Sequence, residues 1–355
     1  MARELWKGNE AIAEAAIKAG CRFFFGYPIT PQNEIPEYMS LRLPQEGGCF
    51  LQAESDVSAI NMVYGAAGAG ARVMTSSSSP GISLKQEGIS YCAGAELPCV
   101  VVNIVRGGPG LGSIQPAQSD YFQATKGGGH GDYKMVVLAP DSIQEAVDLV
   151  QEAFDIADQY RNPVMILGDG MMGQMMEPIE FREVKKRQLP NKDWATTGLK
   201  GRKEHNVVNS LFIDPNECEQ HNYDLFEKYN EMEKSELRYE EYNLDGAEIV
   251  FAAYGTVARI VKNAIKSLEQ EGIKAGLIRP ITLWPFPKEA YLRAAEMPTV
   301  KAFMGVEMSM GQMVEDVELS VKGKKPVYFY GRPGGAVPTP KAIVEEAKKV
   351  LGGAK

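Results

Sequence analysis

Cysteine and histidine are scarce in this chain. Among 355 residues there are five cysteines and three histidines. No two cysteines show CxxC spacing, and their odd number argues against a disulfide framework. An iron–sulfur cluster needs about four clustered thiolates, and a zinc site needs similarly clustered ligands. We therefore expect no iron–sulfur cluster and no metal site held by this chain alone.

Long apolar runs and an excess of positive charge are also missing. The 38 basic and 46 acidic side chains give a net charge of −8, so the chain lacks the basic surface of a protein that binds nucleic acid or an anionic membrane. Glu14 and Lys18 interrupt the apolar N-terminal stretch, and nowhere is there a run of about 18 uncharged apolar residues. We expect no membrane span, no signal peptide and a cytoplasmic location.

Strands and helices are predicted to alternate along the N-terminal half. Short apolar strands are predicted at 22–25, 49–52, 73–75, 99–105 and 163–167, and helices at 9–19, 56–71 and 142–159. This alternation is typical of a parallel sheet covered by helices. In such a sheet, functional groups gather in the loops at the carboxyl ends of the strands. Here those loops contain the sequences YPITP, QAES, SSSSPG and RGGPGLG.

Composition divides the chain into three parts. Residues 1–177 carry the first alternating pattern. Residues 178–246 are rich in charge and tyrosine with little apolar periodicity, which predicts an irregular connector with a solvated, charged face. Over 247–355 the alternation resumes, with predicted strands IVFAAY, GLIRPITL, TVKAFMGVE and 327–330, and helices at 255–271 and after Pro338. This part is predicted to be a second, smaller α/β domain.

Glu54 is the first candidate for chemistry. It follows a short apolar strand and precedes a helix of mostly small or apolar residues, so we expect its surroundings to be buried. A buried carboxylate is costly unless it is paired or moves a proton, although the dipole at a helix start offsets part of the cost. The alternative is a helix-capping acid beside Ser55 or Asp56. The pattern alone leaves both interpretations open.

Two further segments carry candidate ligand-binding groups. Tyr27-Pro28-Ile29-Thr30-Pro31 presents a hydroxyl and main-chain amides from a rigid strand end, which suits a small carbonyl or carboxylate. A rigid turn with no ligand is the alternative. Arg106 ends an apolar strand before a glycine-rich loop, where a guanidinium can bind a carboxylate or phosphate. An exposed strand-end arginine is the alternative.

Two glycine motifs resemble cofactor signatures without completing them. The GGPGLG sequence after Arg106 does not fit the GxGxxG pattern of a nicotinamide dinucleotide site. Gly168-Asp169-Gly170 matches the start of the signature by which thiamin diphosphate enzymes hold magnesium. The asparagine that completes this signature is missing from the region of Ala195-Thr196-Thr197. We therefore expect neither ligand at these loops.

Taken in order, the motifs resemble the α subunit of the 2-oxoacid:ferredoxin oxidoreductases. The series is YPITP, AES before a small-residue helix, SSSSPGISL, an arginine followed by GGPG, then GGHGDY and VLAP. It continues with YGT, IRPITLWPFP and YGRPGG before PTP. The resemblance covers nearly the whole chain and is weakest over 178–246. It implies an α/β thiamin-diphosphate-binding fold, with a parallel sheet domain of the pyrimidine type followed by a smaller transketolase-C-like domain.

The resemblance also implies an oxidative decarboxylation. In this family, thiamin diphosphate bound between two subunits attacks the keto carbon of a 2-oxoacid and carbon dioxide leaves. Electrons pass through iron–sulfur clusters to ferredoxin, and coenzyme A, the co-substrate, takes the acyl group. A β subunit is expected to hold the diphosphate and Mg²⁺. A γ subunit and a ferredoxin-like δ subunit complete the complex, with 4Fe-4S clusters on partner subunits. We expect the γ and δ parts to be separate polypeptides and the isolated chain to be inactive.

Matching by position assigns roles to the candidate residues. Glu54 matches the glutamate that hydrogen-bonds the aminopyrimidine ring of thiamin diphosphate and promotes removal of the thiazolium C2 proton. Thr30 and Arg106 match the residues that hold the substrate's carbonyl and carboxylate, and Tyr27-Pro28-Ile29 belongs to the same substrate-binding segment. Ser79-Pro80-Gly81 is expected on the cofactor side. Many relatives read TSGPG there, so the detail of this loop differs.

Substrate and class remain open to alternatives at this point. The N-terminal segment most resembles α subunits for branched-chain acids such as 3-methyl-2-oxobutanoate, and 2-oxoglutarate is the alternative. The neutral loop after Arg106 offers no second cation for a distal carboxylate, which favours an apolar side chain. A thiamin enzyme of another kind would carry a complete magnesium signature in this chain. A non-catalytic assembly subunit with the same fold would have lost Glu54, Thr30 or Arg106.

Overall fold

A seven-stranded sheet forms the centre of the N-terminal unit in the computed structural model, which describes residues 3–182, 184 and 187–353. The strand order is β12-β6-β7-β5-β4-β2-β3, and only β12 is antiparallel to its neighbour. The strands are β2 (Phe23–Gly26), β3 (Cys49–Gln52), β4 (Val73–Ser77), β5 (Cys99–Val105), β6 (Val136–Leu138), β7 (Pro163–Asp169) and β12 (Thr282–Trp284). The parallel sheet predicted from the alternating pattern is confirmed.

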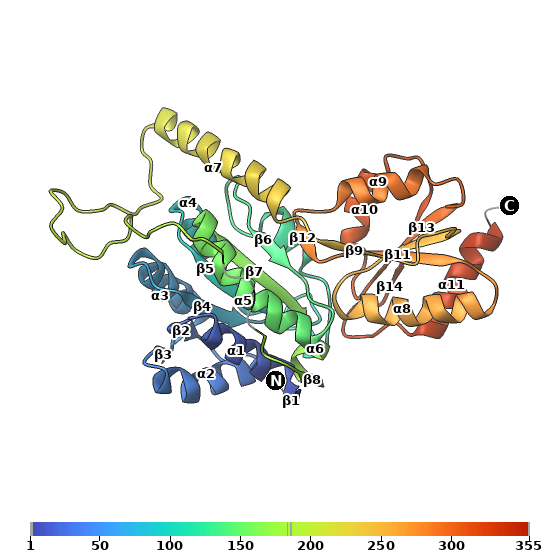
Figure 1. Cartoon of the computed structure of the whole chain (residues 1–355), viewed down its shortest axis with the longest axis horizontal. Helices are drawn as coiled ribbons and strands as arrows, with labels where there is room; N and C mark the ends of the chain where they lie inside the picture. The colour runs from blue at the N-terminus through green and yellow to red at the C-terminus, as the bar shows by residue number, and fades with distance from the viewer. Residues whose placement is uncertain (1–2, 183, 185–186, 354–355) are drawn as a thin grey trace.

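Helices cover both faces of this sheet because its buried strands send apolar side chains to both sides. On β5, Val100 and Val102 pack toward one face and Val101 and Val105 toward the other. The first face is covered by α1 (Gly8–Lys18), α2 (Glu34–Gln45) and α5 (Ile143–Tyr160), and the second by α3 (Asp56–Gly68) and α4 (Ser79–Gly94). Figure 1 shows these layers on either side of the green and blue strands.

The C-terminal unit repeats this architecture on a smaller scale. Its five-stranded sheet has the order β14-β13-β10-β11-β9, parallel except for β9. The strands are β9 (Tyr239–Tyr242), β10 (Ile249–Ala252), β11 (Ala275–Pro280), β13 (Ala302–Glu307) and β14 (Val327–Gly331). One face is covered by α8 (Gly255–Gln270) and α11 (Pro340–Gly353), and the other by α9 (Lys288–Glu296) and α10 (Met313–Val321).

The predicted connector contains a long helix, so the expectation of an irregular structure there is wrong in this part. Helix α7 (Pro215–Ser235) is capped by Asp214, whose carboxylate accepts a hydrogen bond from the main-chain N–H of Asn216. Only Leu225, Tyr229 and Met232 of this helix are buried. Three apolar positions at spacing i, i+4, i+7 give a stripe too narrow to stand out among so many charges. In Figure 1, α7 lies along one side of the N-terminal unit after an extended loop.

Short elements complete the fold. An antiparallel pair joins β1 (Glu4–Lys7) to β8 (Met176–Ile179), and α6 (Gly170–Gln174) follows β7. A short π-helical turn, η1 (Gln123–Gly127), lies between β5 and β6. None of the helices in the described ranges combines the length and apolarity needed to span a bilayer.

The segment GLIRPITL, predicted as one strand, is divided between the two sheets. Its first part is β11 of the C-terminal unit, and its last residues belong to β12, which pairs with β6 of the N-terminal unit. The chain changes direction at Ile281, whose main-chain N–H donates to Arg238 and whose carbonyl accepts from Ala139. A continuous apolar run cannot reveal such a crossing, because both halves are buried strands.

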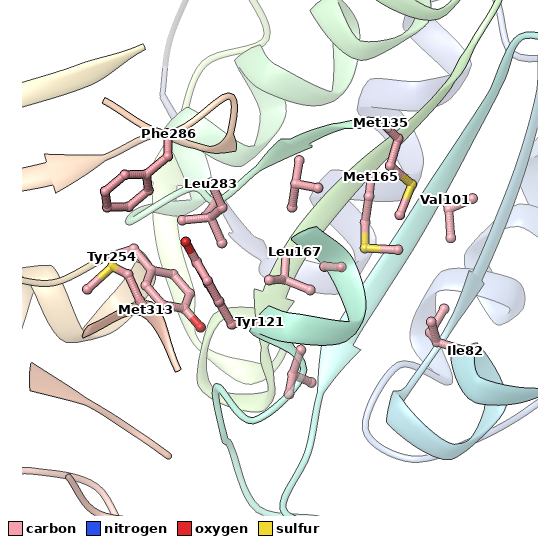
Figure 2. Close-up of a cluster of buried hydrophobic side chains, with 14 of the residues drawn as sticks. Ile82, Val101, Tyr121, Met135, Met165, Leu167, Tyr254, Leu283, Phe286 and Met313 are labelled. Atoms are coloured by element: carbon pink, nitrogen blue, oxygen red, sulfur yellow. The ribbon is translucent and has the colours of Figure 1, made fainter. Parts of the chain in front are cut away.

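The two units share one hydrophobic core. Tyr121 of the N-terminal unit packs against Tyr254 of the C-terminal unit, with ring centroids 5.9 Å apart. Figure 2 shows Met313, Leu283 and Phe286 close by, in a cluster that continues along the sheet toward Met165. The shared core fixes the loops of both units relative to each other.

A buried arginine adds an ionic link between the units. Arg279 of β11 donates two hydrogen bonds to Glu145 of α5, at 2.7 and 2.8 Å, and a third to Glu240 at 2.8 Å. Its side chain is only 5% exposed. Glu145 is itself fixed in the first turn of α5, where the hydroxyl of the N-cap residue Ser142 accepts its main-chain N–H.

We expect Arg279→Met to lower the free energy of unfolding by about 3 kcal/mol, because Glu145 and Glu240 lose their common partner. Denaturant titration of the purified protein measures the effect. Lys301→Met is the control, since its pair with Glu248 is more exposed and should contribute less than about 1 kcal/mol. Equal effects of the two substitutions would show that Arg279 contributes no more than a surface pair.

Candidate active site

Four loops meet at one end of the N-terminal sheet. They follow β5, β4, β2 and β3, which are successive neighbours in the sheet. In that order the loops carry Arg106, Ser79, Thr30 and Glu54. Parallel strands place their carboxyl ends on one edge, so residues far apart in the sequence come together.

Glu54 lies between β3 and α3, and its side chain is exposed. The expectation of buried surroundings is therefore wrong for this chain, because β3 is the edge strand and the described residues leave its carboxyl end uncovered. The Ser58 hydroxyl donates a hydrogen bond to Glu54 Oε1 at 2.9 Å. Ser55 is the helix cap, since its hydroxyl accepts the Ser58 main-chain N–H. The Glu54 carboxylate thus remains accessible to a ligand.

The YPITP segment is a turn with an accessible face. Tyr27, Pro28 and Thr30 are exposed and Ile29 is half-buried, whereas Pro31 is buried. The Thr30 hydroxyl accepts one long hydrogen bond, 3.5 Å, from Asn33 Nδ2. The rigid turn therefore also presents a hydroxyl that a ligand can reach.

Arg106 is buried with 8% of its surface exposed, which rules out an exposed strand-end arginine. Its Nη1 donates to the main-chain oxygen of Thr30 and its Nη2 to that of Leu111, both at 3.0 Å. Nε has no hydrogen-bond partner, and no carboxylate within the described ranges pairs with the guanidinium. A buried cation held only by neutral carbonyls is costly. Within the described residues, this guanidinium therefore has no counter-charge in contact with it.

Asp120, which was not predicted from the sequence, belongs to a group of polar side chains that holds the main chain at Arg106. The Ser79 hydroxyl donates to Asp120 Oδ2 at 2.7 Å and accepts the Arg106 main-chain N–H at 3.1 Å. Asn103 Nδ2 donates to the same Asp120 oxygen at 2.9 Å. Burial raises the pKa of Asp120, and the hydrogen bonds from Ser79 and Asn103 offset part of the rise. Asp120 lies in a polar loop with no motif, so no sequence signal marked it.

Helix α4 starts at Ser79 and is closely packed at its first turn. A Cβ atom on Gly81 would lie 2.0 Å from Ser77 Oγ and 2.5 Å from Asp56 Oδ2. The hydroxyls of Ser77 and Ser78 are buried and have no hydrogen-bond partner in the described chain. Glycine at position 81 therefore lets the first turn of α4 approach the first turn of α3.

Two cavities open at this edge of the sheet. One, of about 550 Å³, is lined by Thr30, Ile114, Met171 and Val337, and the part of its lining that the structure describes contains no lysine or arginine. The other, of about 450 Å³, lies between Ser79, Asp120 and Gly107–Gly110 on one side and residues of the C-terminal unit, Met310, Gln312 and Gly334, on the other. Both cavities are at the junction of the two units.

The two incomplete glycine motifs have structural roles in the described chain. The loop after Arg106 folds back on itself, with the Gly107 main-chain N–H donating to Gln115 and the Ser113 N–H donating to Gly107. The Asp169 carboxylate accepts the main-chain N–H groups of Met171 and Met172 and the Thr256 hydroxyl. Asp169 thereby caps α6 and links the two units.

Comparison with protein families gives two matches that follow each other along the chain. Residues 14–241 match the family described as "Pyruvate flavodoxin/ferredoxin oxidoreductase, thiamine diP-bdg". Residues 247–343 match the family described as "Pyruvate:ferredoxin oxidoreductase core domain II".

Individual relatives cover almost the full chain. The ketoisovalerate oxidoreductase subunit VorB of Methanothermobacter marburgensis is 50% identical over 352 residues, which is 99% of each chain. The 2-oxoglutarate synthase subunit KorA of Methanocaldococcus jannaschii is 36% identical over 366 residues, covering 96% of this chain and 98% of that one.

Solved structures show the same architecture. A chain of the 2-oxoglutarate:ferredoxin oxidoreductase from Magnetococcus marinus, solved with 2-oxoglutarate, coenzyme A and succinyl-CoA bound, superposes with a TM-score of 0.87 at 27% identity. The match covers 98% of the present chain and 65% of that longer chain. A split-gene transketolase shares the fold, with a TM-score of 0.63 at 14% identity.

We expect Gly81→Ala to destabilise the protein, because the added methyl group would displace Ser77 or Asp56, and overpacking of this kind costs about 1–3 kcal/mol. Thermal unfolding measures the change as a lower Tm. Gly108→Ala is the matched control, since its Cβ would meet no atom within 4 Å. Identical melting of the two variants would contradict tight packing at the start of α4.

Proposed function

The chain belongs to the 2-oxoacid:ferredoxin oxidoreductase family, and we propose that it is the subunit that binds the 2-oxoacid by its carboxylate at Arg106 and contributes Glu54 to proton transfer. The reaction is the oxidative decarboxylation of the acid to an acyl-CoA and carbon dioxide, with reduction of ferredoxin. The observation that carries the proposal is the buried Arg106 guanidinium with its unpaired Nε and no carboxylate partner among the described residues.

Arg106 suits a carboxylate for electrostatic and geometric reasons. Two of its five N–H donors bind the carbonyls of Thr30 and Leu111, which fixes the orientation of the guanidinium plane. The remaining donors include Nε, and a planar carboxylate can accept two parallel hydrogen bonds from such a group. Holding the carboxylate in this way orients the neighbouring keto carbon before carbon dioxide leaves. The accessible Thr30 hydroxyl is placed to bind the keto oxygen, with Tyr27-Pro28-Ile29 completing this side of the site.

The residues around Glu54 fit the pyrimidine half of thiamin diphosphate. The Glu54 carboxylate is exposed and receives one hydrogen bond from Ser58, so one oxygen is free to bind a ring nitrogen. Ser79-Pro80-Gly81 forms the first turn of α4, next to the unpartnered hydroxyls of Ser77 and Ser78. When bound, thiamin diphosphate supplies the C2 carbon that adds to the keto group. Glu54 then holds or releases the proton of the aminopyrimidine ring.

The exposure of Glu54 supports a site completed by a second subunit. A carboxylate that acts as an acid and base is more effective away from water. The exposed side chains of Tyr27, Leu51 and Leu111 border the same edge of the sheet and offer apolar surface for a partner. We place a β subunit with the diphosphate and Mg²⁺ on this face. A γ subunit, a ferredoxin-like δ subunit and 4Fe-4S clusters on the partners complete the electron path, and coenzyme A takes the acyl group.

A branched-chain 2-oxoacid such as 3-methyl-2-oxobutanoate is the proposed substrate. The lining of the cavity beside Thr30 combines the apolar side chains of Ile114, Met171 and Val337 with the acidic Glu34, and within the described residues it has no basic side chain. A distal carboxylate, as in 2-oxoglutarate, would be left without a counter-charge from this chain. The higher identity to ketoisovalerate oxidoreductase subunits, 50% against 36% for a 2-oxoglutarate synthase subunit, supports the same choice.

The assay for the proposed function is oxygen-free viologen reduction by the complex purified with its native partners, with coenzyme A and a series of 2-oxoacids. We expect coenzyme A-dependent reduction and the highest kcat/KM for 3-methyl-2-oxobutanoate, above 2-oxoglutarate, pyruvate and an aryl pyruvate. A preference for 2-oxoglutarate would overturn the substrate choice. A complex that contains thiamin diphosphate and iron but reduces no viologen with any acid would overturn the activity.

Glu54→Gln should reduce kcat by at least about 100-fold while the complex still assembles, because the amide cannot exchange the proton. The matched control is Glu87→Gln, since Glu87 is also exposed and accepts a hydrogen bond from a residue four positions later, Tyr91. We expect the control to keep wild-type turnover. Full turnover in Glu54→Gln would sink the assignment of this residue.

Arg106→Ala should raise KM at least about 10-fold for every 2-oxoacid, because a charge-assisted hydrogen bond to the common carboxylate is lost. Steady-state kinetics with three acids of different side chains measures this. Arg202→Ala is the control, since Arg202 also donates to main-chain carbonyls but lies in the loop before α7. An effect confined to one acid would place Arg106 at the substrate's side chain instead of its carboxylate.

A further inference from the structure

Lys85 and Asp56 form a fully buried ion pair beneath the candidate site. The Lys85 side chain of α4 is 0% exposed and the Asp56 side chain of α3 is 3% exposed, with Nζ and Oδ1 2.8 Å apart. The hydrogen bond that Lys85 Nζ donates goes to the main-chain oxygen of Asp56, at 3.4 Å. Burial lowers the pKa of Lys85, and the adjacent Asp56 carboxylate offsets part of that effect. Lys85 therefore contacts both the carboxylate and the main-chain oxygen of Asp56.

Asp56 is the first residue of α3 and lies two positions after Glu54. The hydrogen bond to the Glu54 carboxylate comes from Ser58, in the first turn of the same helix. The position of Glu54 is thus set by where α3 begins. The start of α3 is in turn fixed to α4 at Lys85.

The Asp56 carboxylate also contacts the second segment expected to bind the cofactor, Ser79-Pro80-Gly81. Asp56 Oδ2 is so close to Gly81 that a Cβ atom there would lie 2.5 Å away. Gly81 is in the first turn of α4, directly after Ser79 and Pro80. Asp56 therefore lies between Glu54 and the first turn of α4, which contains Ser79-Pro80-Gly81, and its carboxylate contacts that turn.

Packing of α3 on α4 does not need these charges. Further along the two helices Ile60 fits against Gly88, where a Cβ would come within 2.5 Å of the Ile60 side chain. Apolar and small residues of this kind bring helices together without desolvating a charge. A buried ion pair is often no more stabilising than an apolar pair of the same volume, whereas it can specify one arrangement over its alternatives.

We propose that the Lys85–Asp56 pair is a positioning device that fixes the start of α3 against α4 and so holds Glu54 at the correct distance from the cofactor-binding loop. Neither residue is accessible to substrate or cofactor, so both act through Glu54. The inference rests on the proposed function of Glu54. It adds that the geometry of this carboxylate depends on a charge pair in the core.

The decisive variant is the double substitution Asp56→Asn with Lys85→Met. It removes both charges together, so no unpaired charge is left in the core and the complex should assemble with a Tm near that of the wild type. The paired control is Glu236→Gln with Arg187→Met. The Glu236 side chain is also buried, at 1% exposure, but the pair links two parts of the 178–246 connector, and Arg238 also contacts Glu236.

Two readouts separate positioning from general stability. The first is hydrogen–deuterium exchange of the amides at residues 55–59 in the protein without cofactor. We expect at least tenfold faster exchange in the double variant and no change in the control. The second is the rate of C2 proton exchange of thiamin diphosphate in the loaded complex, measured in D₂O. We expect at least a tenfold slower rate in the double variant, with KM for the 2-oxoacid unchanged.

Rates within twofold of the wild type in both readouts would overturn the positioning role. Fast C2 exchange in Glu54→Gln would instead overturn the proposed function of Glu54, and the positioning role with it. The two failures give different results. If only the positioning role is wrong, C2 exchange in the Glu54→Gln complex is still slow, whereas it is fast if the role of Glu54 is wrong.

If the double variant does not assemble, Asp56→Glu keeps the charge and moves the carboxylate by one methylene. It should slow C2 exchange at least fivefold, and an unchanged rate would overturn the proposal equally.

Discussion

Four neighbouring parallel strands, β5, β4, β2 and β3, end at the same edge of a buried sheet, and the candidate site depends on this alignment. The segment after each strand begins at this edge of the sheet. Arg106, Ser79, Thr30 and Glu54 are therefore brought together without any long-range motif that links them. Helices on both faces bury β4 and β5, whereas the edge strand β3 stays largely exposed.

The treatment of charge differs between the site and the rest of the core. Arg279 and Lys85 are buried beside carboxylates within the described structure, so their cost of desolvation is offset internally. Arg106 has two main-chain carbonyls and an unpaired Nε instead. This contrast supports the proposal that Arg106 binds the carboxylate of the substrate.

The C-terminal unit contributes to the candidate site through tertiary contacts that no motif in its sequence predicted. Gln118 donates to the Tyr254 carbonyl and accepts the Met308 main-chain N–H, which ties the loop after Arg106 to two strand ends of the other unit. Met310, Gln312 and Gly334 then form one wall of the cavity beside Ser79 and Asp120. The shared core around Tyr121 and Tyr254 packs the two units together, so both units hold these loops in place (Figure 2).

Local pattern in the sequence was sufficient to predict most strands and the parallel sheet, because strand and helix periodicity and turn residues are local signals. Helices α2 and α4 were not predicted. The motif series also identified Glu54, Thr30 and Arg106 as candidates. Tertiary structure alone decided that Glu54 is exposed at an edge strand, that Arg106 is buried without a counter-charge, and that GLIRPITL is split between two sheets. It also brought Asp120 to Ser79 and Lys85 to Asp56. Burial and pairing of charges depend on which distant segments meet, and no periodicity within one segment encodes that.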